Sequence, residues 1–159
     1  MYRLVIVLIL SAVCMTNVAR AEECAATVYE GLVIEAKNAD ANRLWESSAA
    51  IYRRILNECR STVVEGDLPK LHDALAVALM MQEKYGEAID VAKKCIELDS
   101  RYNACMMTAA RGYEALGERD MALQFAREAI ETGASDDYSA AVIIDARDFL
   151  KKLEKKQSR

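Results

Sequence analysis

The sequence repeats with a period of 34 residues, which constrains the fold more than any other feature. Residues 69–102 align with residues 103–136 without a gap. A repeat of this length encodes one supersecondary unit, which buries its apolar face only by stacking on a neighbouring unit. The matching positions are Ala76 and Ala110, Ala88 and Ala122, Ala92 and Ala126, Ile96 and Ile130, and Glu97 and Glu131.

Each unit contains two amphipathic helical patterns separated by a short polar turn, at 83–86 in the first unit and at 116–119 in the second. Alanine is needed where two antiparallel helices approach to about 8–10 Å, which accounts for the recurring small residues. The composition agrees, because one proline and six glycines supply too few turns for a many-stranded β fold. We therefore predict an all-α fold.

The spacing of small and apolar residues points to one repeat family. It is carried by Leu75, Ala76, Leu79, Tyr85, Ala88, Ala92 and Cys95 in the first unit, and by Ala109, Ala110, Tyr113, Gly117, Ala122, Ala126 and Ala129 in the second. This pattern resembles the tetratricopeptide repeat. The family often has tryptophan where this chain has His72 and Met106, and proline is common where it has Ser100 and Ala134. The resemblance implies a right-handed superhelical array of helix-turn-helix units with a C-terminal capping helix.

The flanking segments are expected to extend the array. Residues 22–66 are interpreted as a degenerate N-terminal helical pair, with helices over Glu23–Lys37 and Asp40–Arg60. Residues 67–159 then hold the two repeats (69–102 and 103–136) and a capping helix at 137–155. Asp67 is a predicted N-cap with Pro69 in the first turn, and Ser135 or Asp136 is expected to cap the last helix.

Residues 1–21 have the layout of a cleavable secretory signal. Arg3 precedes an apolar run from Leu4 to Met15, and Ala19 and Ala21 place small residues before a cut. A transmembrane anchor is the alternative, but that run is shorter than the about 20 residues that cross a bilayer. A lipoprotein signal fits poorly because Cys14 lacks a small residue just before it. We therefore expect a periplasmic or secreted protein with no membrane span after cleavage.

Four cysteines remain after the signal: Cys24, Cys59, Cys95 and Cys105. An even number in an exported chain favours two disulfides, for which three connectivities are possible. None forms a CxxC pair, so neither a zinc site nor a thioredoxin-like site is indicated. In the repeat architecture the ends of paired helices lie opposite each other, which predicts Cys24–Cys59 and Cys95–Cys105. Helical-repeat families that carry disulfides are a second possibility, but their periods are longer.

The sequence contains no catalytic or cofactor-binding motif that we recognise. Its single histidine, His72, falls on the buried-facing side of a predicted helix, where it is expected to pack rather than react. One histidine cannot build a multi-histidine metal site, and no glycine-rich phosphate loop or GxSxG elbow is present. The acidic balance, with a net charge of −4, argues against sequence-independent nucleic-acid binding. We expect no enzyme activity, no cofactor, no metal and no nucleic acid.

The expected functional feature is a surface. In the resembled family, the first helices of successive units line a concave groove that binds peptides. The basic clamp of some members is absent, because Asp73, Val77 and Thr108 stand at clamp-type positions. Methionines on this face would form an adaptable apolar strip. The predicted partner-binding residues are Lys70, Val77, Met80, Met81, Met107, Thr108, Arg111, Tyr138 and Val142, with Ala74, Ala104, Glu114, Ala141 and Asp145 beside them.

The sequence thus predicts an exported adaptor or scaffold that binds another protein or a peptide. Two alternatives remain open. The array could self-associate as a structural subunit of an envelope or extracellular complex, or His72 could serve a small enzyme.

Overall fold

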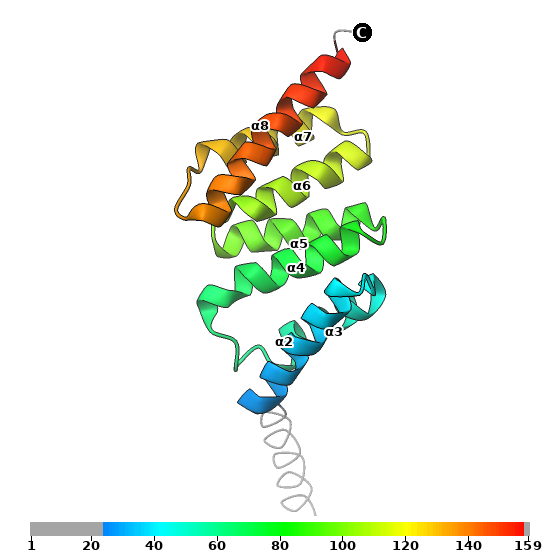
Figure 1. The fold of residues 1–159 in the computed structure, drawn as a ribbon, viewed down its shortest axis with the longest axis vertical. Coiled ribbons are helices and arrows are strands. Elements are labelled where there is room, and N and C mark those ends of the chain that lie inside the picture. The colour runs from blue at the N-terminus through cyan, green and yellow to red at the C-terminus, as the bar shows by residue number, and fades with distance from the viewer. Residues whose placement is uncertain (1–23, 158–159) are drawn as a thin grey trace, which may run out of the picture.

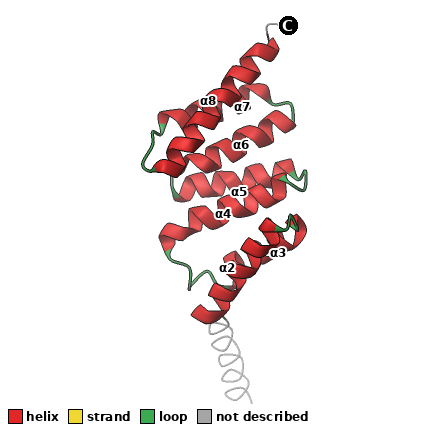
Figure 2. Ribbon diagram, viewed as in Figure 1, coloured by secondary structure: helices red, strands yellow, loops and turns green. Residues whose placement is uncertain are grey.

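The computed structural model describes residues 24–157, and the predicted signal peptide at 1–21 lies outside them. Within this part of the chain every regular element is helical (Figure 1, Figure 2). The elements are α2 (Ala26–Ala41), α3 (Trp45–Glu58), the short 3₁₀ helix η2 (Glu65–Asp67), α4 (Leu68–Met80), α5 (Tyr85–Leu98), α6 (Asn103–Ala115), α7 (Arg119–Glu131) and α8 (Asp137–Gln157). The all-α prediction is confirmed.

The helices form three antiparallel hairpins, α2–α3, α4–α5 and α6–α7, which stack in a row (Figure 1). The last helix, α8, closes the row by packing against both α7 and α6. The recurring alanines lie where helices meet, and Ala36, Ala76 and Ala110 of the three first helices are completely buried. At Gly112 the approach is closer still, because a Cβ added there would lie 2.7 Å from Ile89 Cγ1.

The hairpin turns show that the N-terminal pair follows the same plan as the other two. Each turn contains one residue with positive φ, namely Arg43 (57°), Glu83 (61°) and Gly117 (79°). The second and third are one 34-residue period apart, whereas the first precedes the second by six residues more. The loop and η2 helix between α3 and α4 accommodate the extra residues.

The predicted boundary between the first two helices was wrong. The first helix continues through Ala41, so Asp40 belongs to its end rather than to the start of the second helix. There Asp40 accepts hydrogen bonds from the Ser48 hydroxyl and from the Tyr52 hydroxyl, the latter at 2.8 Å. These bonds to α3 favour the continuation of α2 to Ala41.

Of the two predicted N-caps, one side chain caps its helix and the other does not. Asp67 occupies the N-cap position of α4, but its side chain makes no cap hydrogen bond and instead forms an ion pair with Lys70 at 2.9 Å. Asp136 does cap α8, because its Oδ1 accepts the Ser139 backbone N–H at 2.7 Å. The N-cap of α8 is therefore Asp136 and not Ser135.

Two disulfides join the same cysteine pairs that the repeat architecture predicts. Cys24 before α2 is bonded to Cys59 at the end of α3, with their Cα atoms 5.0 Å apart. Cys95 on α5 is bonded to Cys105 on α6, with a Cα separation of 6.2 Å. One disulfide therefore closes the first hairpin, and the other fixes the second hairpin to the third.

Candidate functional site

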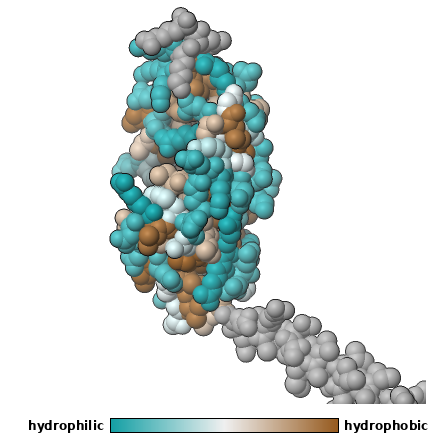
Figure 3. All heavy atoms as spheres, turned by 90° about the vertical axis from the view of Figure 1, so that its right-hand side faces the viewer, coloured by the Kyte–Doolittle hydropathy of each residue, from teal (hydrophilic) through white to brown (hydrophobic). Residues whose placement is uncertain are grey.

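The first helices of the hairpins, together with α8, present one face of the array. α4 contacts α6, and α6 contacts α8, so these helices form a continuous surface. On α4, the side chains of Val77 and Met81 are 41% and 53% exposed. The side that carries the hairpin turns is different, because it is mainly hydrophilic, with hydrophobic residues only in separate patches (Figure 3).

Sequence reasoning missed one apolar residue of this face. Ile34 on α2 occupies the helix position that Ala74 occupies on α4, and its side chain is 61% exposed. The six extra residues before α4 concealed this equivalence. Aligning Ala36 with Ala76, at a spacing of 40 rather than 34 residues, would have revealed that Ile34 corresponds to Ala74.

Two of the predicted partner-binding residues lie in the interior. Met107 is only 3% exposed and belongs to a core cluster with Phe149 and Leu153 of α8. Thr108 is also buried. Met107 is covered because α8 packs across α6 as well as α7, whereas Thr108 donates a hydrogen bond to Asp73 of α4.

The other predicted residues remain accessible to different degrees. Met80 and Val142 are half-buried, each packed against a core cluster. Arg111 is exposed but is not a free cation, because its guanidinium forms an ion pair with Asp145 of α8 at 2.6 Å. An exposed pair of this kind contributes little to stability, about 0–1 kcal/mol. The most accessible apolar side chains of the face are therefore on α2 and α4, and Tyr138 at the start of α8 is exposed to a similar extent.

A buried carboxylate lies beside this accessible part. The side chain of Asp73 on α4 is 8% exposed and accepts a hydrogen bond from the Thr108 hydroxyl at 3.0 Å. Burial raises the pKa of Asp73 from 3.8 to about 6, although the hydrogen bond from Thr108 opposes the rise. At neutral pH, Asp73 is therefore mostly ionised in a site that disfavours the charge.

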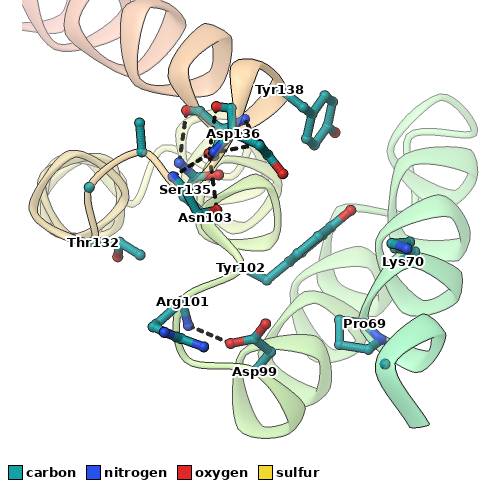
Figure 4. A pocket seen from close by; sticks show the side chains of 14 residues that line it. Pro69, Lys70, Asp99, Arg101, Tyr102, Asn103, Thr132, Ser135, Asp136 and Tyr138 are labelled. Atoms are coloured by element: carbon teal, nitrogen blue, oxygen red, sulfur yellow. Dashed lines mark hydrogen bonds between the residues drawn. The ribbon is translucent and has the colours of Figure 1, made fainter.

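A polar pocket of about 440 Å³ opens where the N-terminal ends of α4, α6 and α8 come together. Tyr102 crosses this space toward α4, and Tyr138 from α8 lies near its hydroxyl end (Figure 4). Burial raises the pKa of both phenols, and the charges of Asp73 and Asp136 raise both further. The hydroxyl groups thus face a negative environment.

Three other charged residues that line the pocket, Asp136, Asp99 and Lys70, each have a partner of their own. Hydrogen bonds from Ser139 lower the pKa of Asp136, because the carboxylate caps α8. Asp99 accepts the Arg101 backbone N–H at 2.9 Å, on the side of Tyr102 away from Tyr138 (Figure 4). Lys70 extends to Asp67.

His72, which the sequence placed on the buried-facing side of its helix, is covered only in part. It is half-buried, its Nδ1 donates a hydrogen bond to the Leu68 carbonyl at 2.9 Å, and it lines a second pocket of about 500 Å³. The other residues at this pocket are Arg53, Leu56, Asn57, Arg60, Leu75, Val91 and Lys94, which include neither a carboxylate nor a nucleophile. The lining therefore offers no partner for general-base catalysis by His72.

Over residues 24–157 there is no group of three or more side chains that could hold a metal ion. In the same range, no helix combines the length and the apolar character that crossing a bilayer requires.

No protein-family model and no curated protein matches this sequence. Several solved structures match in fold. PcrH, a protein of Pseudomonas aeruginosa, in complex with the chaperone binding region of PopD aligns with a TM-score of 0.73 at 15% identity, over 84% of this chain and 96% of that chain. The type III secretion translocator chaperone SycD of Yersinia enterocolitica aligns with a TM-score of 0.72 at 16% identity, over 87% of this chain and 99% of that chain. The TPR2AB domain of yeast Sti1 in its pHSP90 complex aligns with a TM-score of 0.72 at 19% identity, over 91% of this chain and 54% of that chain.

Proposed function

We propose that this chain, which has the tetratricopeptide-repeat fold, is an exported interaction module that binds a peptide or protein segment along the face formed by its first helices. It would act as a periplasmic or secreted adaptor rather than as an enzyme. The similar structures of PcrH and Sti1 are complexes with a region of PopD and with pHSP90, which supports a binding role for this fold.

One observation carries the proposal. Ile34, Val77 and Met81 are large apolar side chains that lie on one face of successive first helices and remain exposed. Exposed apolar residues that gather on one face are typical of binding surfaces. Methionine adds adaptability, because its flexible thioether fits irregular partners.

The stacked hairpins favour binding in a second way. Disulfides close the first hairpin and join α5 to α6, so the helices that present this face are held in place before a partner arrives. A preorganised surface reduces the entropy lost on association. Disulfides persist in oxidising compartments, which supports export.

Co-purification from the native source after gentle crosslinking tests the proposal, with wild type compared with the double variant Val77→Glu/Met81→Glu. Both side chains are exposed, so the variant is expected to fold. The matched control is Leu98→Glu/Leu116→Glu, which charges two exposed apolar residues at the end of α5 and in the α6–α7 turn.

A partner that wild type and the control retain, and that the double variant loses, supports the proposal. Equal recovery by all three proteins contradicts it. Recovery of only a second copy of this chain would instead favour the self-assembling structural subunit.

A further inference from the structure

Asp73 has less stabilisation than its burial requires. Buried carboxylates in folded proteins are normally paired with a cation or accept several hydrogen bonds. Among the described residues, no basic side chain forms an ion pair with Asp73, and Thr108 supplies its one hydrogen bond. Even that bond is shared, because the same hydroxyl also lies 3.1 Å from the Ala104 carbonyl and has a single proton to donate.

The side chains around Asp73 add negative potential and aromatic surface. On the chain before α6, Tyr102 directs its hydroxyl toward α4, and Tyr138 at the start of α8 exposes its ring beside it (Figure 4). Asp73 lies at the same junction of α4 and α6, because it is hydrogen-bonded to Thr108 of α6, and its charge raises the pKa of both phenols. A cation gains both from a carboxylate and from the faces of tyrosine rings.

The neighbouring cations do not fill this role. Lys70 lies one helical turn before Asp73 on α4, but its ammonium is held by Asp67 at 2.9 Å. Arg101 lies beside Asp99, on the other side of Tyr102 (Figure 4). On α8, Asp136 contributes a further negative charge.

We infer that the space between Asp73, Tyr102 and Tyr138 binds a lysine or arginine side chain of the segment that occupies the concave face, an inference that rests on the proposed function. The basic group supplies the counter-charge that Asp73 lacks, while the apolar part of the segment lies over Val77 and Met81. Segments with acidic residues at this place are rejected, because they meet the charges of Asp73 and Asp136.

Selection from a library of random short peptides, displayed on phage, tests the inference without knowledge of the natural partner. Peptides selected on wild type are measured against three proteins: wild type, Asp73→Asn and the control Asp90→Asn. The control removes the same charge from an exposed position on α5. Asparagine keeps the shape of Asp73 and can still accept the Thr108 hydrogen bond, so the variant is expected to fold.

The selected peptides are expected to contain lysine or arginine and to lose about tenfold or more in affinity for Asp73→Asn, but not for Asp90→Asn. Replacing the basic residue by norleucine completes a double-mutant cycle. This replacement should weaken binding to wild type and leave binding to Asp73→Asn almost unchanged.

The remaining outcomes separate the two proposals. Peptides that lose affinity for Val77→Glu/Met81→Glu but bind Asp73→Asn as well as wild type would overturn the basic anchor and leave the concave binding face intact. Selection of no peptide, or of peptides indifferent to Val77→Glu/Met81→Glu, would overturn the proposed function and the anchor with it.

Discussion

Replacing Asp73 by asparagine should raise the stability of the free protein at neutral pH. Burial raises the pKa of Asp73 from 3.8 to about 6, so the ionised form is less stable in the folded protein than in the unfolded chain. At about 1.4 kcal/mol per pKa unit, this difference corresponds to about 3 kcal/mol in the free energy of unfolding. Asparagine removes the charge and retains the hydrogen-bond acceptor for Thr108. We expect a gain of about 1–3 kcal/mol at pH 7.

The gain should depend on pH with a defined sign. Between about pH 4 and pH 6 the folded protein binds a proton at Asp73 that the unfolded chain does not, so the wild type loses stability as the pH rises through this range. Below about pH 4 the carboxyl is protonated in both states, and wild type and variant should be similar. Above about pH 6 the difference should be at its maximum.

Urea unfolding of both proteins from about pH 4 to pH 8 measures this dependence. Other carboxylates contribute equally to wild type and variant, so they cancel in the difference. Asp90→Asn, which removes the same charge from an exposed position on α5, is the control. A difference between Asp73→Asn and wild type that is constant with pH, or that grows as the pH falls, would refute the reasoning.

Two further predictions concern packing and crosslinks. Gly112→Ala should destabilise the protein by about 1–3 kcal/mol in urea unfolding, because its Cβ would overlap Ile89. Gly86→Ala, at a helix position with open space around it, should stabilise by about 0.5–1 kcal/mol; destabilisation by both or neither would contradict this assignment. Removing Cys24–Cys59 by a double serine substitution should cost about 4 kcal/mol, since it closes a 35-residue separation, and an unchanged urea midpoint would contradict the entropic estimate.

The repeated part of the fold could be predicted because its determinants are local in sequence. Ala76 and Ala110 are completely buried, as their recurrence at one period suggests. The N-terminal hairpin was harder to predict, because six extra residues before α4 move it out of register with the period. Its turn is not the reason, since Arg43 has the same positive φ that Glu83 has in the second hairpin.

The candidate site could be predicted only in part, because it depends on contacts between distant segments. The repeat pattern placed Val77 and Met81 on an exposed face. It also placed Met107 there, but that residue is buried in a core cluster that includes Phe149 and Leu153 of α8. No periodicity within the repeats specifies the angle at which a terminal helix crosses them. Sequence reasoning identified Asp73 as a departure from a basic clamp, without revealing that it is buried.

A structural role alone does not account for the charge of Asp73, because asparagine would keep its hydrogen bond to Thr108 without the cost of desolvation. If a basic side chain of the partner pairs with Asp73, the complex recovers what the free protein loses. Binding should then stabilise wild type more than Asp73→Asn, since the partner's affinity adds to folding stability by mass action. Urea unfolding with a saturating basic peptide should therefore reduce or reverse the advantage of the variant. An advantage that persists undiminished in the complex would show that no counter-charge reaches Asp73.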